Sequence, residues 1–255
     1  MAYSEYIGRG SIRPHIVPSP SESERAGLKV GRLLCGSSTA WETFDPTLLL
    51  AQSDLDLVIM RYPSEQVGIA EKLSSQEYTC FLADTLLYLS VDLTGSTRKP
   101  SAVSNYRLSA CASESRAPLV TEIFRGYTNH YSANSLLGGL ATDSAYADWA
   151  DSQSMADHKE FLQIENSLGQ VVGIAVLDLE EEGWDELTLV GIVPQFRRQG
   201  ILTDLLELLK ERAGDRGKPS LVTSTQTHNL YSLRGFCDAG LRPCLSLNTL
   251  HIVKY

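Results

Sequence analysis

Two adjacent arginines and a glycine stand where an apolar run gives way to a helix, in VGIVPQFRRQGILTDLLELLKERA (190–213). The start of a helix leaves backbone N–H groups without partners and carries a partial positive charge. Gly200 permits unusual backbone angles and close approach of a ligand, and Arg197 and Arg198 add positive charge beside it. Together these features predict an anion site, best suited to phosphate. Because short glycine motifs often mislead, a plain core-packing helix is an alternative interpretation.

The elements around this motif predict a mixed α/β domain. A strand over 103–110 and a helix over 117–127, with Pro118 near its first turn, come before three strands over 159–165, 170–179 and 186–193. The turn NSLG predicts a hairpin between the first two of these three strands. The amphipathic helix over 201–213 follows, and then a strand over 218–226, a short helix and a closing strand.

The first half of the chain predicts a smaller α/β unit. Residues 55–63 and 83–93 are typical of strands, and 64–76 of a helix with Ser64 as a possible N-cap. Residues 13–25 are rich in proline and serine and predict an irregular arm, and the polar segment 94–101 is a candidate domain boundary. We therefore divide the chain into an arm (1–30), an N-terminal α/β domain (31–97) and a C-terminal domain (98–255).

Composition restricts the function classes. The chain has 255 residues, of which 43% are hydrophobic and 21% charged, and a formal charge of -9. This charge argues against a broad nucleic-acid or membrane-binding surface. Five cysteines without CxxC spacing predict reduced thiols and no metal site. The first residues do not resemble a signal peptide and no apolar run is long enough to cross a bilayer, so we expect a cytoplasmic protein. The sequence allows a homodimer without specifying one.

The run from Ile192 to Leu202 resembles the acyl-CoA signature of the GNAT N-acyltransferases, and the order of elements matches that family. The resemblance implies an α/β GNAT fold for the C-terminal domain and a partial GNAT-like fold for the N-terminal one. It implies that Ile192 and Val193 present backbone groups to the pantetheine arm of coenzyme A. It also implies that the pyrophosphate is held by a set of loop residues, namely Arg197, Arg198, Gln199, Gly200, Ile201, Leu202 and Thr203. Leu202 departs from the family pattern, in which glycine or alanine is usual.

A second segment, NLYSLRGFCDAGLRP (229–243), resembles the asparagine-containing segment near the C-terminus of that family. The resemblance implies that Asn229 contacts the coenzyme. Phe236 stands among the coenzyme-binding positions, where a tyrosine usually protonates the leaving thiolate. Because phenylalanine has no proton to donate, Tyr231 or Cys237 is an alternative acid, or no acid is needed, since a thiol with a pKa of about 8.5 is a tolerable leaving group. A core position is the other interpretation of Phe236.

The acceptor site is sought in GYTNHYSANSLL (126–137). Its aromatic and amide side chains suit a sugar or a nucleotide base, and they are Tyr127, Asn129, His130, Tyr131 and Asn134. His130 is the candidate general base because an imidazole titrates near neutral pH. Asp148 or Glu122 acting through water, and a purely structural His130, are alternatives. The backbone N–H of Val193 is the candidate oxyanion donor.

The segments AWETFD (40–45) and Tyr146-Ala147-Asp148-Trp149 make the chain similar to the bacterial dTDP-fucosamine N-acetyltransferase group. This similarity implies transfer of an acetyl or a short acyl group, such as hydroxybutyryl, to a dTDP-linked amino-dideoxysugar for surface-polysaccharide biosynthesis. Trp41 would contact that substrate, unless it packs in a corner of the N-terminal domain. Two alternatives stay open: an acyltransferase for a protein or another small amine, and a regulator that binds acyl-CoA without turnover.

Overall fold

The chain forms two compact units that interleave along the sequence. The computed structural model describes residues 3–7, 12–74, 78–94, 105–153 and 156–254. Unit 1 comprises Met1–Leu86, Thr128–Thr142 and Leu245–Tyr255, and unit 2 comprises Leu87–Tyr127 and Asp143–Cys244. Strands β4 (Tyr78–Asp92) and β10 (Arg242–Lys254) supply residues to both units. The predicted domains were instead continuous segments of the chain, 31–97 and 98–255. Most of the predicted linker 94–101 lies outside the described residues, so these domain boundaries stay a prediction.

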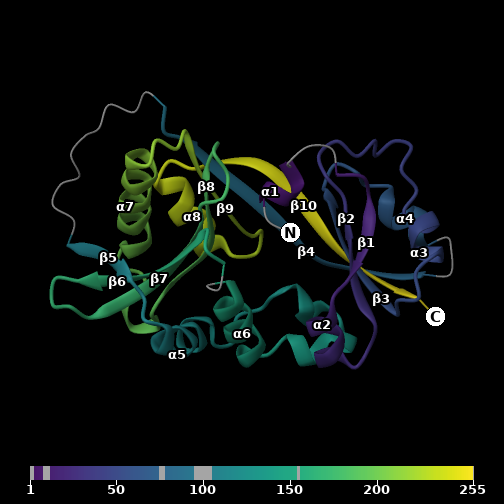
Figure 1. Cartoon of the computed structure of the whole chain (residues 1–255), viewed down its shortest axis with the longest axis horizontal. Helices are drawn as coiled ribbons and strands as arrows, with labels where there is room; N and C mark the ends of the chain where they lie inside the picture. The colour runs from purple at the N-terminus through teal and green to yellow at the C-terminus, as the bar shows by residue number, and fades with distance from the viewer. Residues whose placement is uncertain (1–2, 8–11, 75–77, 95–104, 154–155, 255) are drawn as a thin grey trace. The chain divides into compact units, whose positions relative to one another are not determined.

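Unit 1 is a small mixed sheet with short helices (Figure 1). Its strands follow the order β1-β2-β3-β10-β4; β1 and β2 are antiparallel, β2 and β3 parallel, and β3 and β10 antiparallel. Its other elements are α1 (Tyr3–Ile7), β1 (His15–Pro18), α2 (Pro20–Ala26), β2 (Val30–Leu34), α3 (Thr47–Ala51), β3 (Leu57–Pro63), α4 (Ile69–Ser74) and the 3-10 helices η1 (His130–Ala133) and η2 (Ser135–Leu140). Neighbouring strand residues alternate between two apolar clusters, with Met60 in one and Ile59 in the other.

Two local predictions for unit 1 are wrong. The proline-rich segment 13–25 is not irregular, because it holds β1 and α2. Proline supplies a helical φ and lacks only an N–H that the first helical turn would leave unpaired, so Pro20 begins α2 instead of excluding it. Helix α4 begins at Ile69, so Ser64 is not its N-cap. The predicted strands over 55–63 and 83–93 are confirmed as β3 and β4.

Unit 2 has the strand order β4-β9-β8-β7-β6-β5, in which β5 to β8 are antiparallel neighbours and β8 and β9 are parallel. Its elements are β5 (Tyr106–Ala110), α5 (Ser113–Phe124), α6 (Asp143–Gln153), β6 (Lys159–Asn166), β7 (Val171–Asp178), β8 (Asp185–Ile192), η3 (Pro194–Phe196), α7 (Ile201–Asp215), β9 (Ser220–Gln226) and α8 (Leu230–Asp238). The predicted three-strand run is confirmed, with Gly169 in a left-handed conformation at the hairpin turn. Helix α5 begins at Ser113, so Pro118 lies inside it and not near its first turn.

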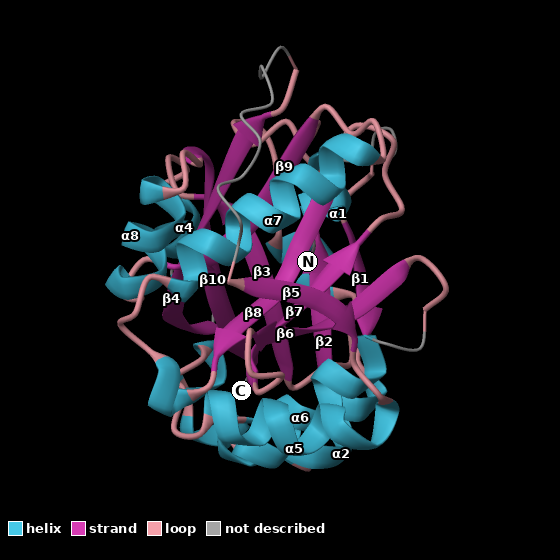
Figure 2. Ribbon diagram, turned by 90° about the vertical axis from the view of Figure 1, so that its left-hand side faces the viewer, coloured by secondary structure: helices cyan, strands magenta, loops and turns pink. Residues whose placement is uncertain are grey.

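Helices cover both faces of the unit 2 strands. Leucines of α7, including Leu205, Leu206 and Leu209, are buried in one apolar cluster, and Val120 and Ile123 of α5 lie in the other. The ribbon views accordingly show α7 and α5 on opposite sides of β6 and β7 (Figures 1 and 2). Among the described helices, none combines the length and apolar character that a membrane crossing requires.

Candidate functional site

Strands β8 and β9 diverge within unit 2. Their parallel pairing ends with Leu187 opposite Thr223, whereas β8 continues to Ile192 and β9 to Gln226. The last β8 residues therefore turn one backbone edge toward a side that β9 has left. Backbone groups in such an opening are available to an extended ligand that offers hydrogen bonds of its own.

The amide that faces this opening follows from strand alternation. The N–H of Val193 donates to the carbonyl oxygen of Val172 in β7 at 2.9 Å. Neighbouring residues of a strand direct their backbone groups to opposite sides, so the N–H of Ile192 points toward the side that β9 has left. The prediction that Val193 donates to an oxyanion is thus wrong in this structure, because its N–H is already engaged. Ile192 carries the amide with the required direction.

The loop after β8 turns sharply into α7. Arg198 and Gly200 both take left-handed φ angles, 63° and 78°, and Gly200 is the N-cap of α7. The carbonyl oxygen of Gly200 accepts the N–H groups of Thr203 and Asp204, at 3.0 and 3.2 Å. The amides of residues 200–202 precede the first intrahelical acceptors and have none within α7. A Cβ atom built on Gly200 would meet no heavy atom within 4 Å, so the loop is open to a ligand.

The two arginines have different surroundings. Arg197 donates from Nε to the carbonyl oxygen of Ile192 at 3.0 Å and from Nη2 to that of Ile123 at 2.5 Å. These bonds tie the end of β8 to α5. The guanidinium of Arg198 lies 5.7 Å from the ring centre of Tyr231, over its face. Both side chains are exposed, but Arg197 is engaged by two carbonyl oxygens, so the charge of Arg198 is the one of the pair that is placed to meet an anion.

The remaining predicted loop residues serve mainly through their backbone. Ile201 is buried in the core under α7. The side-chain amide of Gln199 donates to the carbonyl oxygen of Gln195 at 3.4 Å. Leu202 packs onto Gly235 of α8: a Cβ atom built on that glycine would lie 2.7 Å from Leu202 Cδ2. Leu202 therefore does not crowd the loop, because a glycine in the neighbouring helix makes room for it.

Asn229 and Phe236 position α8. The side-chain oxygen of Asn229 accepts the N–H of Ser232 at 3.3 Å, and its Nδ2 donates to Thr225 Oγ1 at 3.1 Å. Asn229 is therefore the N-cap of α8 and ties it to β9. Phe236 is 1% exposed inside the apolar core, so its assignment as a coenzyme contact is wrong and the core interpretation holds. Tyr231, in the first turn of α8, is 75% exposed.

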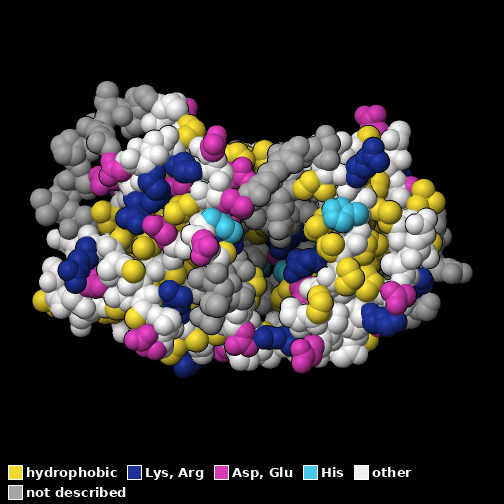
Figure 3. All heavy atoms as spheres, viewed as in Figure 1, with side chains coloured by type: hydrophobic (Ala, Val, Ile, Leu, Met, Phe, Trp, Pro, Cys, Tyr) yellow, Lys and Arg dark blue, Asp and Glu magenta, His cyan; other side chains and the backbone are white. Residues whose placement is uncertain are grey.

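The basic charge along α7 is largely used by ion pairs. Lys and Arg side chains gather over this helix in the space-filling view (Figure 3). Arg212 binds the carboxylate of Glu160 through several hydrogen bonds, the shortest 2.8 Å. Arg216 pairs with the fully buried Asp185. These pairs fix α7 and its C-terminal end to the strands, whereas Arg198 stands at the opposite end of the helix.

The predicted acceptor residues are divided between the units. Tyr127 belongs to unit 2, where its hydroxyl donates to Gln226 Oε1 at the end of β9. Its ring packs against Phe124 and Tyr146, with centroids 5.8 Å away in each case. Burial raises the pKa of Tyr146 above its ordinary value. Trp149 continues this aromatic cluster and is 41% exposed, so unit 2 presents an aromatic surface next to the end of α5.

The other predicted acceptor residues lie in η1 and η2 of unit 1. Asn129 and Asn134 use their side-chain oxygens as helix caps, accepting the N–H groups of Tyr131 and Leu136 at 3.0 Å. The hydroxyl of Tyr131 donates to Glu22 and accepts from Arg32. Burial raises the pKa of Tyr131. These contacts are structural, and they occupy the side-chain oxygens of Asn129 and Asn134 and the hydroxyl of Tyr131, which the sequence analysis assigned to the acceptor.

His130 is buried beside a second histidine. Its Nδ1 lies 3.0 Å from Nε2 of His251. Burial lowers the pKa of His130 well below its ordinary value of 6.5, and the positive charge of Arg61 lowers it further. His130 is therefore a neutral imidazole near pH 7 with little tendency to take a proton. Trp41 is also buried, with its ring packed edge-on against Phe44 at 5.7 Å, which favours the packed-corner interpretation over substrate contact.

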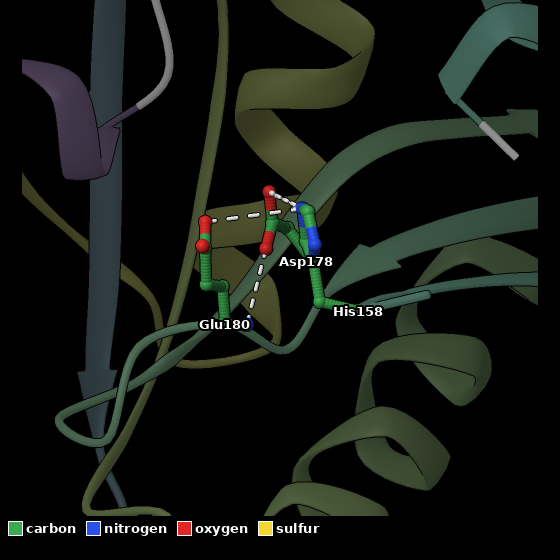
Figure 4. Close-up of side chains that lie close together, drawn as sticks. All are labelled: His158, Asp178 and Glu180. Atoms are coloured by element: carbon green, nitrogen blue, oxygen red, sulfur yellow. Dashed lines mark hydrogen bonds and ion pairs between the residues drawn. The ribbon is translucent and has the colours of Figure 1, made fainter. Parts of the chain in front are cut away.

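One mixed group of possible metal ligands occurs among the described residues (Figure 4). His158 Nε2 lies 3.8 Å from both Asp178 Oδ2 and Glu180 Oε2. Lys159 Nζ also lies 3.5 Å from the same Asp178 oxygen. Because this ammonium supplies a positive charge to the shared carboxylate, we assign the group as an ion-pair cluster at the ends of β6 and β7. The sequence analysis did not select these residues, which only the pairing of the two strands brings together.

Comparison with known proteins supports the interpretation of the loop. Residues 124–236 match the model of the acetyltransferase (GNAT) family. This segment is similar to a GNAT acetyltransferase domain. The matched segment spans the splayed strands, the loop and α8 as far as Phe236, which is consistent with an N-acyltransferase, and GNAT acetyltransferases use acetyl-CoA as co-substrate. No curated protein matches the chain by sequence.

Solved structures show the same fold over most of the chain. A GCN5-related N-acetyltransferase from Sphaerobacter thermophilus aligns with a TM-score of 0.61 at 12% identity, over 92% of this chain and 75% of that one. One from Kribbella flavida aligns with a TM-score of 0.54 at 14% identity, over 89% and 81%. A tandem GNAT protein of the clavulanic acid biosynthesis pathway aligns with a TM-score of 0.55 at 12% identity, over 88% and 75%. At these identities the likeness establishes the mixed α/β GNAT fold.

Proposed function

We propose that this GNAT protein transfers an acetyl or short acyl group from acyl-CoA to the amine of a dTDP-linked amino-deoxysugar, for surface-polysaccharide biosynthesis. One observation carries the acyl-CoA part of the proposal: β8 and β9 diverge just before a glycine-capped loop and helix. An extended pantetheine arm fits an open strand edge, and a pyrophosphate fits unpaired amides at a helix start. No metal enters this reaction.

The residues present fit coenzyme A. The open space at Gly200 and the unpaired amides of residues 200–202 suit the pyrophosphate, with Arg198 as the cationic neighbour. Ile192 offers its N–H to the pantetheine arm or to the acyl oxygen. The Asn229 cap holds α8 beside this site, because it links the start of that helix to Thr225. Arg197 stabilises the turn and is not assigned a direct contact.

Acyl-CoA supplies an activated carbonyl carbon and a thiolate leaving group. The chain contributes the Ile192 N–H as a fixed donor for the oxyanion, which is stabilised best by amides that need no rearrangement. Phe236 cannot protonate the thiolate, and the acids that α8 offers are the exposed hydroxyl of Tyr231 and the exposed thiol of Cys237. His130 is a poor proton acceptor near pH 7 because burial lowers its pKa, so we expect the amine to enter unprotonated or to lose its proton to water.

The aromatic surface of unit 2 supports the acceptor class. The ring of Tyr146 contacts the rings of both Tyr127 and Trp149, and Trp149 is partly exposed. Aromatic faces bind nucleotide bases and sugar rings by stacking. For a base, replacing the aromatic residue by alanine weakens the binding free energy by about 1–3 kcal/mol. We therefore propose that this surface stacks on the thymine or the sugar of the acceptor.

Thiol release from acetyl-CoA tests the proposal. The acceptors are dTDP-, UDP- and GDP-linked amino sugars, together with peptides bearing a free N-terminus, lysine and polyamines. We expect the fastest release with a dTDP-linked amino sugar, and slower release in a Trp149→Ala variant through a higher KM for that sugar. Release with peptides or simple amines but with no nucleotide sugar would refute the acceptor assignment and leave the acyltransferase activity intact.

A second candidate function is favoured by Phe236. Because the position that usually carries the acid is a buried phenyl ring, the chain is also suited to bind acyl-CoA without turnover, as a regulator. Calorimetry distinguishes the two functions: saturable acetyl-CoA binding without thiol release from any amine would support the regulator. The sequence allows a homodimer without specifying one, and light scattering of the purified chain measures the oligomeric state directly.

A further inference from the structure

Leu202 and Gly235 are matched in size across the contact between α7 and α8. A Cβ atom on Gly235 would lie 2.7 Å from Leu202 Cδ2, 3.3 Å from its Cγ and 3.8 Å from its Cβ. The first distance is far inside van der Waals contact and the second is tight. The leucine side chain therefore lies flat on the glycine, and neither position can grow without displacing the other.

The two helices that meet here are α7, whose first turn carries the proposed pyrophosphate-binding amides, and α8. Leu202 is the second residue of α7, two positions after the Gly200 cap, and its own backbone amide is one of the three unpaired amides. Gly235 belongs to α8, which the Asn229 side chain caps and ties to β9. Farther along, Lys210 Nζ of α7 donates to the carbonyl oxygen of Ala239, just after α8, at 2.9 Å. The helices are thus joined at two places, Leu202 to Gly235 and Lys210 to Ala239, and a shift at Leu202 is taken up by the first turn of α7.

Core packing alone does not account for Leu202. Its neighbour Ile201 is 2% exposed and fills the apolar cluster under α7, whereas Leu202 is only partly buried against the edge of that cluster. A partly exposed leucine at this position removes less apolar surface from water than Ile201 does. Its specific contact is the glycine surface of α8.

We propose that Leu202 and Gly235 form a positioning contact that sets the first turn of α7 relative to α8 and thereby the placement of the amides that bind the coenzyme pyrophosphate. The side chain of Leu202 acts through its contact with α8 and does not itself touch the coenzyme. This inference rests on the proposed acyl-CoA site. It also explains why a bulky residue stands where the family usually has glycine or alanine: the small residue of the pair is at Gly235.

Gly235→Ala is the first test. A merely structural role predicts a change in thermal stability alone, in which the better helix propensity of alanine and overpacking against Leu202 act in opposite directions, and an unchanged KM. A positioning role predicts a KM for acetyl-CoA raised about tenfold with kcat within about twofold, since sub-ångström to 1 Å misplacements near a site cost that much or more. Gly214→Ala is the matched control, because it lies in α7 and its Cβ would meet no heavy atom within 4 Å.

The compensating pair is the second test. In Leu202→Ala/Gly235→Ala the added methyl group fills space that the shorter side chain vacates, so we expect KM to return to within about threefold of the wild-type value. Leu202→Ala alone should raise KM, and it carries the test if Gly235→Ala does not fold. An unchanged KM in Gly235→Ala, or a double variant worse than both single ones, overturns the inference. Failure of the wild-type chain to bind acetyl-CoA would instead overturn the proposed function.

Discussion

Substituting the two adjacent arginines one at a time should separate stability from coenzyme binding. Arg197 donates to the carbonyl oxygens of Ile192 and Ile123 and so ties β8 to α5. Arg198 is exposed next to the Gly200 turn, with its guanidinium over Tyr231. We therefore predict that Arg197→Ala lowers the melting temperature, whereas Arg198→Ala weakens acetyl-CoA binding and leaves the melting temperature nearly unchanged.

The expected magnitudes follow from these contacts. A hydrogen bond from a charged donor contributes about 1.5–3 kcal/mol, and solvent exposure of Arg197 reduces its two bonds to about 2 kcal/mol together. For a chain of this size each kcal/mol corresponds to about 2–4 °C, so Arg197→Ala should melt about 4–8 °C lower. Removing one charge about 5 Å from a phosphate, at an effective dielectric constant of about 40, costs about 1.7 kcal/mol, or about 15-fold in Kd.

Differential scanning calorimetry and isothermal titration with acetyl-CoA measure both quantities on both variants. Since surface charge effects are screened by salt, the loss in Arg198→Ala should shrink between low and high ionic strength. The reasoning is refuted if Arg198→Ala destabilises the chain as much as Arg197→Ala. It is also refuted if Arg197→Ala weakens binding as strongly as Arg198→Ala at a temperature where both variants are fully folded.

Two further predictions concern buried charge. Burial holds the pKa of His251 at about 4 and that of His130 well below its ordinary value, so the unfolded chain binds more protons below pH 6.5. The contribution of these two histidines to the free energy of unfolding is complete above pH 6.5 and is lost as the pH falls toward 4. Urea unfolding across this range should show the loss, and His251→Gln should make the free energy of unfolding less dependent on pH. Asp185 is fully buried and paired with Arg216, so Asp185→Asn should cost about 3–5 kcal/mol in urea unfolding. Glu207→Gln is the control, because the Glu207 side chain is 49% exposed where it pairs with Lys210, and it should cost under about 1 kcal/mol; equal losses would contradict the assignment.

Local patterns in the sequence were enough to predict the strands and the main helix of unit 2. The NSLG turn with Gly169 and the apolar face of α7 are such patterns, because each depends on residues close together in the chain. Helix α6 was missed because its sequence, with three aspartates and two serines, has little apolar periodicity. Helix α2 was missed because its proline and serines are also typical of irregular segments.

The site required information that only strand pairing supplies. Whether the N–H of Ile192 or that of Val193 is exposed depends on the pairing register of β8 with β7, which a single sequence does not reveal. His130 and His251 are 121 residues apart, so their contact could not be predicted locally. The different surroundings of Arg197 and Arg198 likewise come from α5 and α8, and not from the two adjacent letters in the sequence.

Titration of acetyl-CoA into the wild-type chain and into Gly200→Asp tests the central claim most directly. The substitution blocks backbone approach and places a negative charge beside the pyrophosphate, at a glycine with open space around it. Gly214→Asp places the same charge near the far end of α7 and is the matched control. We predict saturable binding by the wild type and Gly214→Asp, and no detectable binding by folded Gly200→Asp. Equal affinity in all three proteins would contradict the assignment of this loop as the coenzyme site.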